Sequence, residues 1–112
     1  MKKAALTLVA LLTLCACHHN TTPDGVLDTA EMSAFLVDAY LLESYNAIEN
    51  RSNPTDPTPA IRSAYDDILR RHGVTQQEVE ASLDYYGKHP DEYRVILGRV
   101  SARLDAESNK QR

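Results

Sequence analysis

Four histidines and two cysteines are the side chains of this 112-residue chain with the widest chemical repertoire. His18 and His19 directly follow Cys17, so a metal site has to be weighed there against a simple linker pair. No two histidines stand four residues apart, and no cysteine lies near His72 or His89. Zinc sites, phosphate loops and nucleophile elbows need such spacings or a glycine-rich turn. We therefore predict a linker pair, no metal, no catalytic residue and no enzymatic activity.

Asp38 is the carboxylate with the most distinctive sequence surroundings. Leu41, Leu42 and Tyr45 follow it by three, four and seven residues, so Asp38 borders an apolar helical stripe. A carboxylate in this position needs a hydrogen-bond donor, for which Ser82, a tyrosine hydroxyl or an arginine are candidates. A catalytic acid is the alternative. No second carboxylate is placed to complete a pair, so we favour a structural role for Asp38 and Ser82.

Tyrosine is the dominant aromatic residue, with six copies beside one phenylalanine and no tryptophan. Tyrosine joins a large contact area to a polar tip and is enriched at interfaces. The residues predicted to contact a partner are Tyr40, Tyr45 and Tyr85. The other three share a helical spacing with isoleucine and leucine, and are predicted to be core residues with the hydroxyl at the rim: Tyr65, Tyr86 and Tyr93.

The segment before Cys17 resembles the lipobox of bacterial lipoprotein signal peptides. Lys2 and Lys3 precede an apolar run over residues 4–14, which is shorter than the roughly 20 residues of a membrane-spanning helix. The sequence Leu-Cys-Ala-Cys then occupies residues 14–17. The resemblance implies that residues 1–16 are removed and that Cys17 carries a diacylglycerol and an N-acyl chain, with no other cofactor. An ordinary secretory signal is the alternative.

The residues after the lipidation site bear on location. Histidine rather than aspartate follows Cys17, which by resemblance to the enterobacterial sorting rule indicates the outer membrane. Residues 18–22 carry no acidic cluster, unlike the start of surface-exported lipoproteins of Bacteroidota. We therefore expect a lipid-anchored envelope protein on the periplasmic side, whose partners are the membrane and another envelope protein.

The charge balance excludes a further class of partner. The chain has a formal net charge of −4, and loss of Lys2 and Lys3 with the signal makes the mature chain more acidic. An acidic chain offers no electrostatic footprint for nucleic acid. A chain of this length forms one domain with a modest core, which leaves little room for a deep catalytic pocket.

Helix-start and helix-stop signals predict a compact all-α bundle of about four helices. A capping box at Asp28 and Glu31 opens the first, which is apolar around much of its girth and so is either central or offers a face to a partner; we favour central. A proline-rich loop over residues 50–59 follows, and short connections then favour helical hairpins. The predicted parts are a signal peptide (1–16), a lipidated tether (17–27), a helical domain (28–105) and a fraying polar tail (106–112).

An ensemble of short motifs is similar to the small Bacteroidota lipoproteins of domain-of-unknown-function family 4296. The motifs are Met-Ser-Ala-Phe-Leu-Val-Asp at 32–38, Tyr-Asp-Asp-Ile-Leu at 65–69, His-Gly-Val-Thr at 72–75, Ser-Leu-Asp-Tyr-Tyr at 82–86 and His-Pro at 89–90. Val79 departs from the family pattern, which has an aromatic residue there. The resemblance implies location and fold class, and no activity.

These observations lead to one functional hypothesis and one alternative. The hypothesis is a membrane-tethered, non-enzymatic envelope lipoprotein that acts as a protein-interaction or assembly module. A lipid anchor raises the effective concentration of such a module near membrane partners. The alternative is a holdase-like periplasmic chaperone, whose mark would be weak binding to many unfolded chains.

Overall fold

The computed structural model describes residues 22–49 and 57–112. Within these ranges the chain forms four helices and no strand, so the predicted all-α class is confirmed. The predicted signal peptide, the lipidation site at Cys17, the histidine pair at 18 and 19, and most of the loop over 50–59 lie outside the described residues.

Helix α2 (Thr29–Glu49) begins where the capping box predicts. The Asp28 carboxylate accepts a 2.8 Å hydrogen bond from the backbone N–H of Glu31, which satisfies one of the amides left free at a helix start. Such a cap contributes about 1 kcal/mol. The cap therefore sets the start of α2 before any tertiary contact is considered.

Helices α3 (Pro59–His72) and α4 (Gln76–Gly87) are separated by a two-part stop and start signal. Gly73 adopts a left-handed conformation (φ 64°) and its N–H caps the end of α3, a conformation that suits glycine. Thr75 and Glu78 then form a capping box, with both reciprocal hydrogen bonds present. The N-cap of α3 is Thr58, whose hydroxyl accepts a 3.3 Å hydrogen bond from the Ile61 N–H.

Helix α5 (Pro90–Lys110) is longer than predicted. Residues 106–110 continue the helix, so the prediction of a fraying tail from residue 106 is wrong for most of that segment. No proline or glycine interrupts these residues, and Lys110 pairs with Glu107 one turn earlier at 3.4 Å. The tail is nevertheless exposed throughout.

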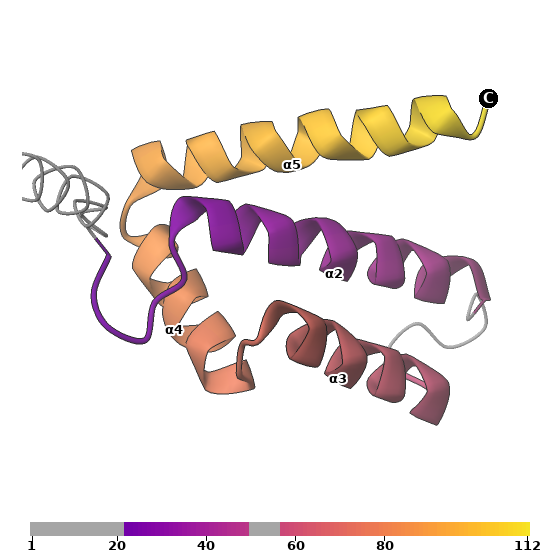
Figure 1. The fold of residues 1–112 in the computed structure, drawn as a ribbon, viewed down its shortest axis with the longest axis horizontal. Coiled ribbons are helices and arrows are strands. Elements are labelled where there is room, and N and C mark those ends of the chain that lie inside the picture. The colour runs from indigo at the N-terminus through magenta and orange to yellow at the C-terminus, as the bar shows by residue number, and fades with distance from the viewer. Residues whose placement is uncertain (1–21, 50–56) are drawn as a thin grey trace, which may run out of the picture.

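The arrangement makes α2 the central element, as favoured from the sequence. Helix α2 packs against α3 on one side and α5 on the other, while α4 lies across the end at which α2 begins (Figure 1). The expectation of a hairpin between α3 and α4 is wrong, because α4 packs mainly on α5 and turns away from α3 directly after Gly73.

The core is concentrated at the end of the bundle that α4 covers. The buried residues of α2 all fall in its first part, where they meet residues from each of the other helices. The buried apolar side chains are Leu27, Met32, Phe35, Leu36, Val37, Ile68, Val79, Tyr86, Ile96 and Val100. No side chain of α2 beyond Val37 is buried, so the second half of the central helix extends past the core.

Candidate functional site

The second half of α2 carries an exposed apolar stripe. Leu41, Tyr45 and Ile48 are 45%, 57% and 63% exposed, and their spacing of i, i+4 and i+7 places them on one face of the helix. We call these three residues the α2 stripe. Single exposed apolar residues are ordinary, whereas three in line on one helix are the usual form of a helix-binding seam.

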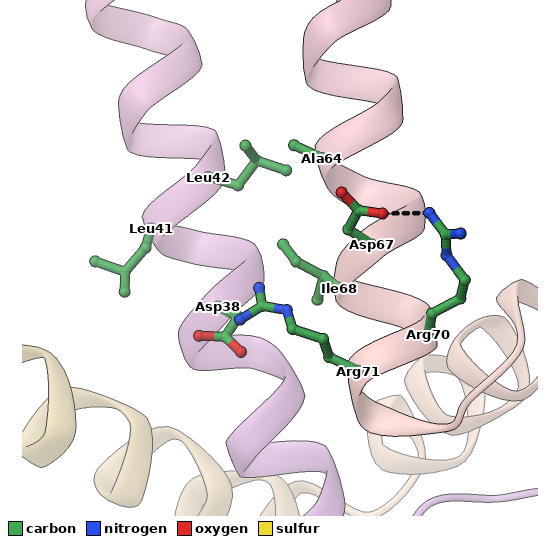
Figure 2. A pocket seen from close by; sticks show the side chains of 8 residues that line it. All are labelled: Asp38, Leu41, Leu42, Ala64, Asp67, Ile68, Arg70 and Arg71. Carbon is green, nitrogen blue, oxygen red and sulfur yellow. Dashed lines mark hydrogen bonds and ion pairs between the residues drawn. The ribbon is translucent and has the colours of Figure 1, made fainter.

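A shallow groove of about 630 Å³ runs beside the stripe, between α2 and α3 (Figure 2). Its apolar floor consists of Leu41, Leu42, Ala64 and Ile68. Its polar rim consists of Asp38, Asp67, Arg70 and Arg71. We call this the α2–α3 groove. Because Leu41 belongs to both features, stripe and groove form one continuous surface.

Three of the four charged side chains on the groove rim have a partner among the described residues. Arg70 forms an ion pair with Asp67 one turn earlier on α3, drawn as a dashed line in Figure 2. Asp38 meets His72, with 2.7 Å between Oδ2 and Nε2. Among the described residues Arg71 has no hydrogen bond or ion pair, and its side chain extends from α3 towards α2. Figure 2 shows the Arg71 guanidinium extending towards Asp38, without an ion pair between the two side chains.

Asp38 makes an inter-helix hydrogen bond, but to a residue that sequence reasoning had not paired with it. The expected donors were Ser82, a tyrosine or an arginine, whereas the structure places His72 there. His72 is in the last turn of α3, and its ring also lies edge-on to Phe35, with centroids 5.9 Å apart. A histidine at a helix end carries no sequence signal for this partner, because the approach of α3 to α2 determines it.

A double-mutant cycle on Asp38 and His72 tests this inter-helix contact. We expect Asp38→Ala and His72→Ala to show a coupling free energy of about 1 kcal/mol in urea unfolding, since the pair is only partly buried. His72→Ala should cost more by itself, because it also removes the ring beside Phe35. Strictly additive single effects would show that the two side chains do not interact.

The three tyrosines predicted to contact a partner do not form one surface. Tyr45 is well exposed in the second half of α2, whereas Tyr85 belongs to α4 at the opposite end of the bundle and stacks on His89. The side chain of Tyr40 is 36% exposed, less than that of Tyr45. Burial and, next, the neighbouring Tyr93 raise the pKa of Tyr40. Only Tyr45 therefore joins the α2 stripe, and contact of the three tyrosines with a partner stays a prediction.

Ser82 and Tyr86 are structural, and both act on the segment that leads into α2. The Leu27 N–H donates to Ser82 Oγ at 2.8 Å, and the Tyr86 hydroxyl donates to the Leu27 carbonyl at 2.7 Å. Ser82 Oγ in turn donates to the Glu78 carbonyl. Burial, with Glu92 as the next contributor, raises the pKa of Tyr86 to about 12. We call the hydrogen bonds of Ser82 and Tyr86 to the Leu27 backbone the Leu27 clamp.

The predicted rim position of the core tyrosine hydroxyls is wrong for Tyr86, which is fully buried because the segment before α2 folds over it. Tyr65 is half-buried, and its hydroxyl donates to Gln76 at 2.7 Å. Tyr93 is half-buried against the core. The Leu27 clamp was missed because no local spacing signals a bond across more than fifty residues of chain.

Other parts of the described chain offer less. A second hollow of about 500 Å³ lies between α2 and α3 and includes Leu42, Ile61 and Tyr65. No group of three or more histidine, cysteine or acidic side chains within residues 22–49 and 57–112 could hold a metal ion. In the same ranges no helix combines the length and apolar character needed to cross a bilayer.

Comparison with known proteins yields a family and nothing finer. The sequence profile described as "Domain of unknown function (DUF4296)" matches residues 23–110, which include every helix of the described residues. No curated protein and no solved structure matches the chain.

Proposed function

This chain belongs to the DUF4296 family of domains of unknown function, and we propose that it is a non-enzymatic protein-interaction module of the cell envelope. In this proposal lipids on Cys17 tether it to the periplasmic face of the outer membrane of a Bacteroidota cell. The α2 stripe is the observation that carries the interaction role, because three aligned apolar side chains remain uncovered on the central helix.

The position at which the tether enters the folded domain indicates how the domain would be oriented on the membrane. The Leu27 clamp ties the chain entering α2 to α4, at the end of the bundle opposite the second half of α2 (Figure 1). Thr22 is the fifth residue after Cys17, and five such steps along the chain span at most about 18 Å. A lipid on Cys17 would therefore hold the α4 end near the membrane, and the α2 stripe would face away from it.

In-cell cross-linking tests the proposed function. The full-length protein is cross-linked in its native cells, purified and analysed by mass spectrometry, beside the Cys17→Ala variant. We expect one dominant envelope partner to be captured with the parent protein. The Cys17→Ala variant should no longer capture this partner and should no longer be found in the membrane fraction. Absence of any stoichiometric partner, or membrane retention of the variant, would contradict the tethered interaction module.

Tyr45→Ala is expected to weaken the captured complex about tenfold, since an exposed aromatic anchor typically accounts for 1–2 kcal/mol of binding. Its thermal stability should change little, because the side chain is mostly exposed. Leu83→Ala is the matched control, an exposed apolar residue on α4 away from the stripe. The comparison is made by quantitative pull-down and by the midpoint of thermal unfolding, and equal binding by both variants would place the contact elsewhere.

A holdase-like chaperone remains the second candidate. The observation in its favour is that hollows line both sides of the seam between α2 and α3, with Leu42 common to the two. Short helices with open apolar grooves can receive unfolded segments. The same cross-linking experiment separates the two functions, because a chaperone would capture many unrelated envelope proteins.

A further inference from the structure

We propose that the occupant of the α2 stripe and the α2–α3 groove is an acidic amphipathic helix of the partner protein. This inference rests on the proposed function and names the chemistry of the partner segment. It commits to a helix because of the residue spacing on α2, and to acidic side chains because the Arg71 guanidinium on the groove rim makes no hydrogen bond or ion pair with another described residue.

The spacing on α2 is that of a helix-packing seam. Asp38, Leu41, Tyr45 and Ile48 are separated by three, four and three residues, which is the alternation of the core positions of a coiled coil. Helix α2 already has α3 and α5 as lateral neighbours, and the stripe lies on a face that neither covers. A further helix laid on this face would bury the stripe, and α3 would form one wall of its binding site.

The charge of the occupant follows from Arg71. Asp38 is engaged by His72, and Asp67 is engaged by Arg70, so the two rim acids are occupied. Within residues 22–49 and 57–112 the Arg71 guanidinium makes no hydrogen bond, and a carboxylate on the incoming helix could accept two of its donors beside the apolar floor. An acidic residue flanking the apolar positions of the partner helix is therefore the complementary group.

The net charge of the whole chain predicts the opposite preference, which makes the inference testable. With a net charge of −4, the protein should on general electrostatic grounds attract basic peptides and repel acidic ones. A preference for an acidic helix would therefore have to come from the local guanidinium and would oppose the net charge.

The test uses two stapled helical peptides with leucine at i, i+4 and i+7. One peptide has glutamate on both sides of the leucines and the other has lysine at the same positions. Binding to the full-length protein in detergent micelles is followed by fluorescence anisotropy. We expect the glutamate peptide to bind about fivefold more tightly, which is the upper range for one partly exposed ion pair. Arg71→Gln should abolish this preference and Arg71→Glu should reverse it.

Two variants locate the peptide on the surface. Tyr45→Glu should abolish binding of both peptides, whereas Val95→Glu, at a comparably exposed apolar position on α5, should leave both dissociation constants within about twofold. Circular dichroism verifies that each variant is folded. Equal affinity for the two peptides, preference for lysine, or binding unaffected by Tyr45→Glu would overturn the inference.

The outcome is separable from that of the proposed function. A photo-cross-linking residue at position 48 identifies what covers the stripe in cells. A dominant partner cross-linked elsewhere on the protein, or through a segment without acidic amphipathic character, would overturn the helix inference and leave the interaction module intact. Cross-links to a second copy of this chain would overturn it in favour of a homodimer. Failure to find any partner would overturn both.

Discussion

Tyr86→Ala is expected to lower the free energy of unfolding by about 3–5 kcal/mol, the range for truncating a buried large aromatic side chain. Tyr86 is fully buried at the junction of α4 with the segment entering α2, and its ring lies edge-on to Tyr85 at 5.1 Å. The truncation also leaves the Leu27 carbonyl without its donor. A domain of this size is typically stable by only 5–15 kcal/mol, so the variant should be largely destabilised.

Tyr86→Phe is the matched control, because it removes the hydroxyl and keeps the ring. We expect a loss of about 1–3 kcal/mol, the cost of leaving one buried acceptor unpaired. Both variants are measured by urea unfolding followed by far-ultraviolet circular dichroism. Equal stability of Tyr86→Phe and the parent protein would show that the Leu27 clamp contributes nothing through this bond.

The same residue gives a prediction for alkaline pH. The pKa of Tyr86 is raised from 10.0 to about 12 in the fold, so the hydroxyl loses its proton more readily in the unfolded chain. Its contribution to stability is therefore complete below pH 10 and is lost progressively as the pH rises through 12. The difference in unfolding free energy between the parent and Tyr86→Phe should shrink across this window, and a constant difference would contradict the raised pKa.

Phe35→Ala is expected to cost a similar 3–5 kcal/mol and to act chiefly on the attachment of α3. Phe35 is 2% exposed, and its ring meets Tyr65 and His72 of α3 edge-on, with centroids 6.2 Å and 5.9 Å away. Removal of the ring takes away the main aromatic contact between α2 and α3 and the support of the Asp38–His72 pair.

Hydrogen exchange locates this effect within the molecule. We expect the amides of α3 to lose protection in Phe35→Ala more than those of α5, which packs on the other side of α2. Leu41→Ala is the control on the same helix, since its side chain is 45% exposed and its loss should cost well under 1 kcal/mol. Uniform loss of protection across all four helices would show that α3 does not open independently.

The sequence by itself determined several of the helix boundaries. Asp28 with Glu31 and Thr75 with Glu78 start α2 and α4, and Gly73 ends α3. Each of these signals acts within a few residues, because capping groups satisfy amides and carbonyls of the adjacent turn. Helical spacing likewise puts Met32, Phe35 and Leu36 on one face of α2, and all three are buried in the core.

Only the tertiary structure decided which distant residues meet. The bond of Asp38 to His72, the Leu27 clamp and the separation of Tyr45 from Tyr85 all depend on how α3 and α4 cross the central helix. Crossing geometry arises from the packing of whole helix surfaces, and no short sequence pattern encodes it. The spacing of Leu41, Tyr45 and Ile48 shows that these residues share one face of a helix. Only the tertiary structure shows that this face is exposed, because the buried core reaches no further along α2 than Val37.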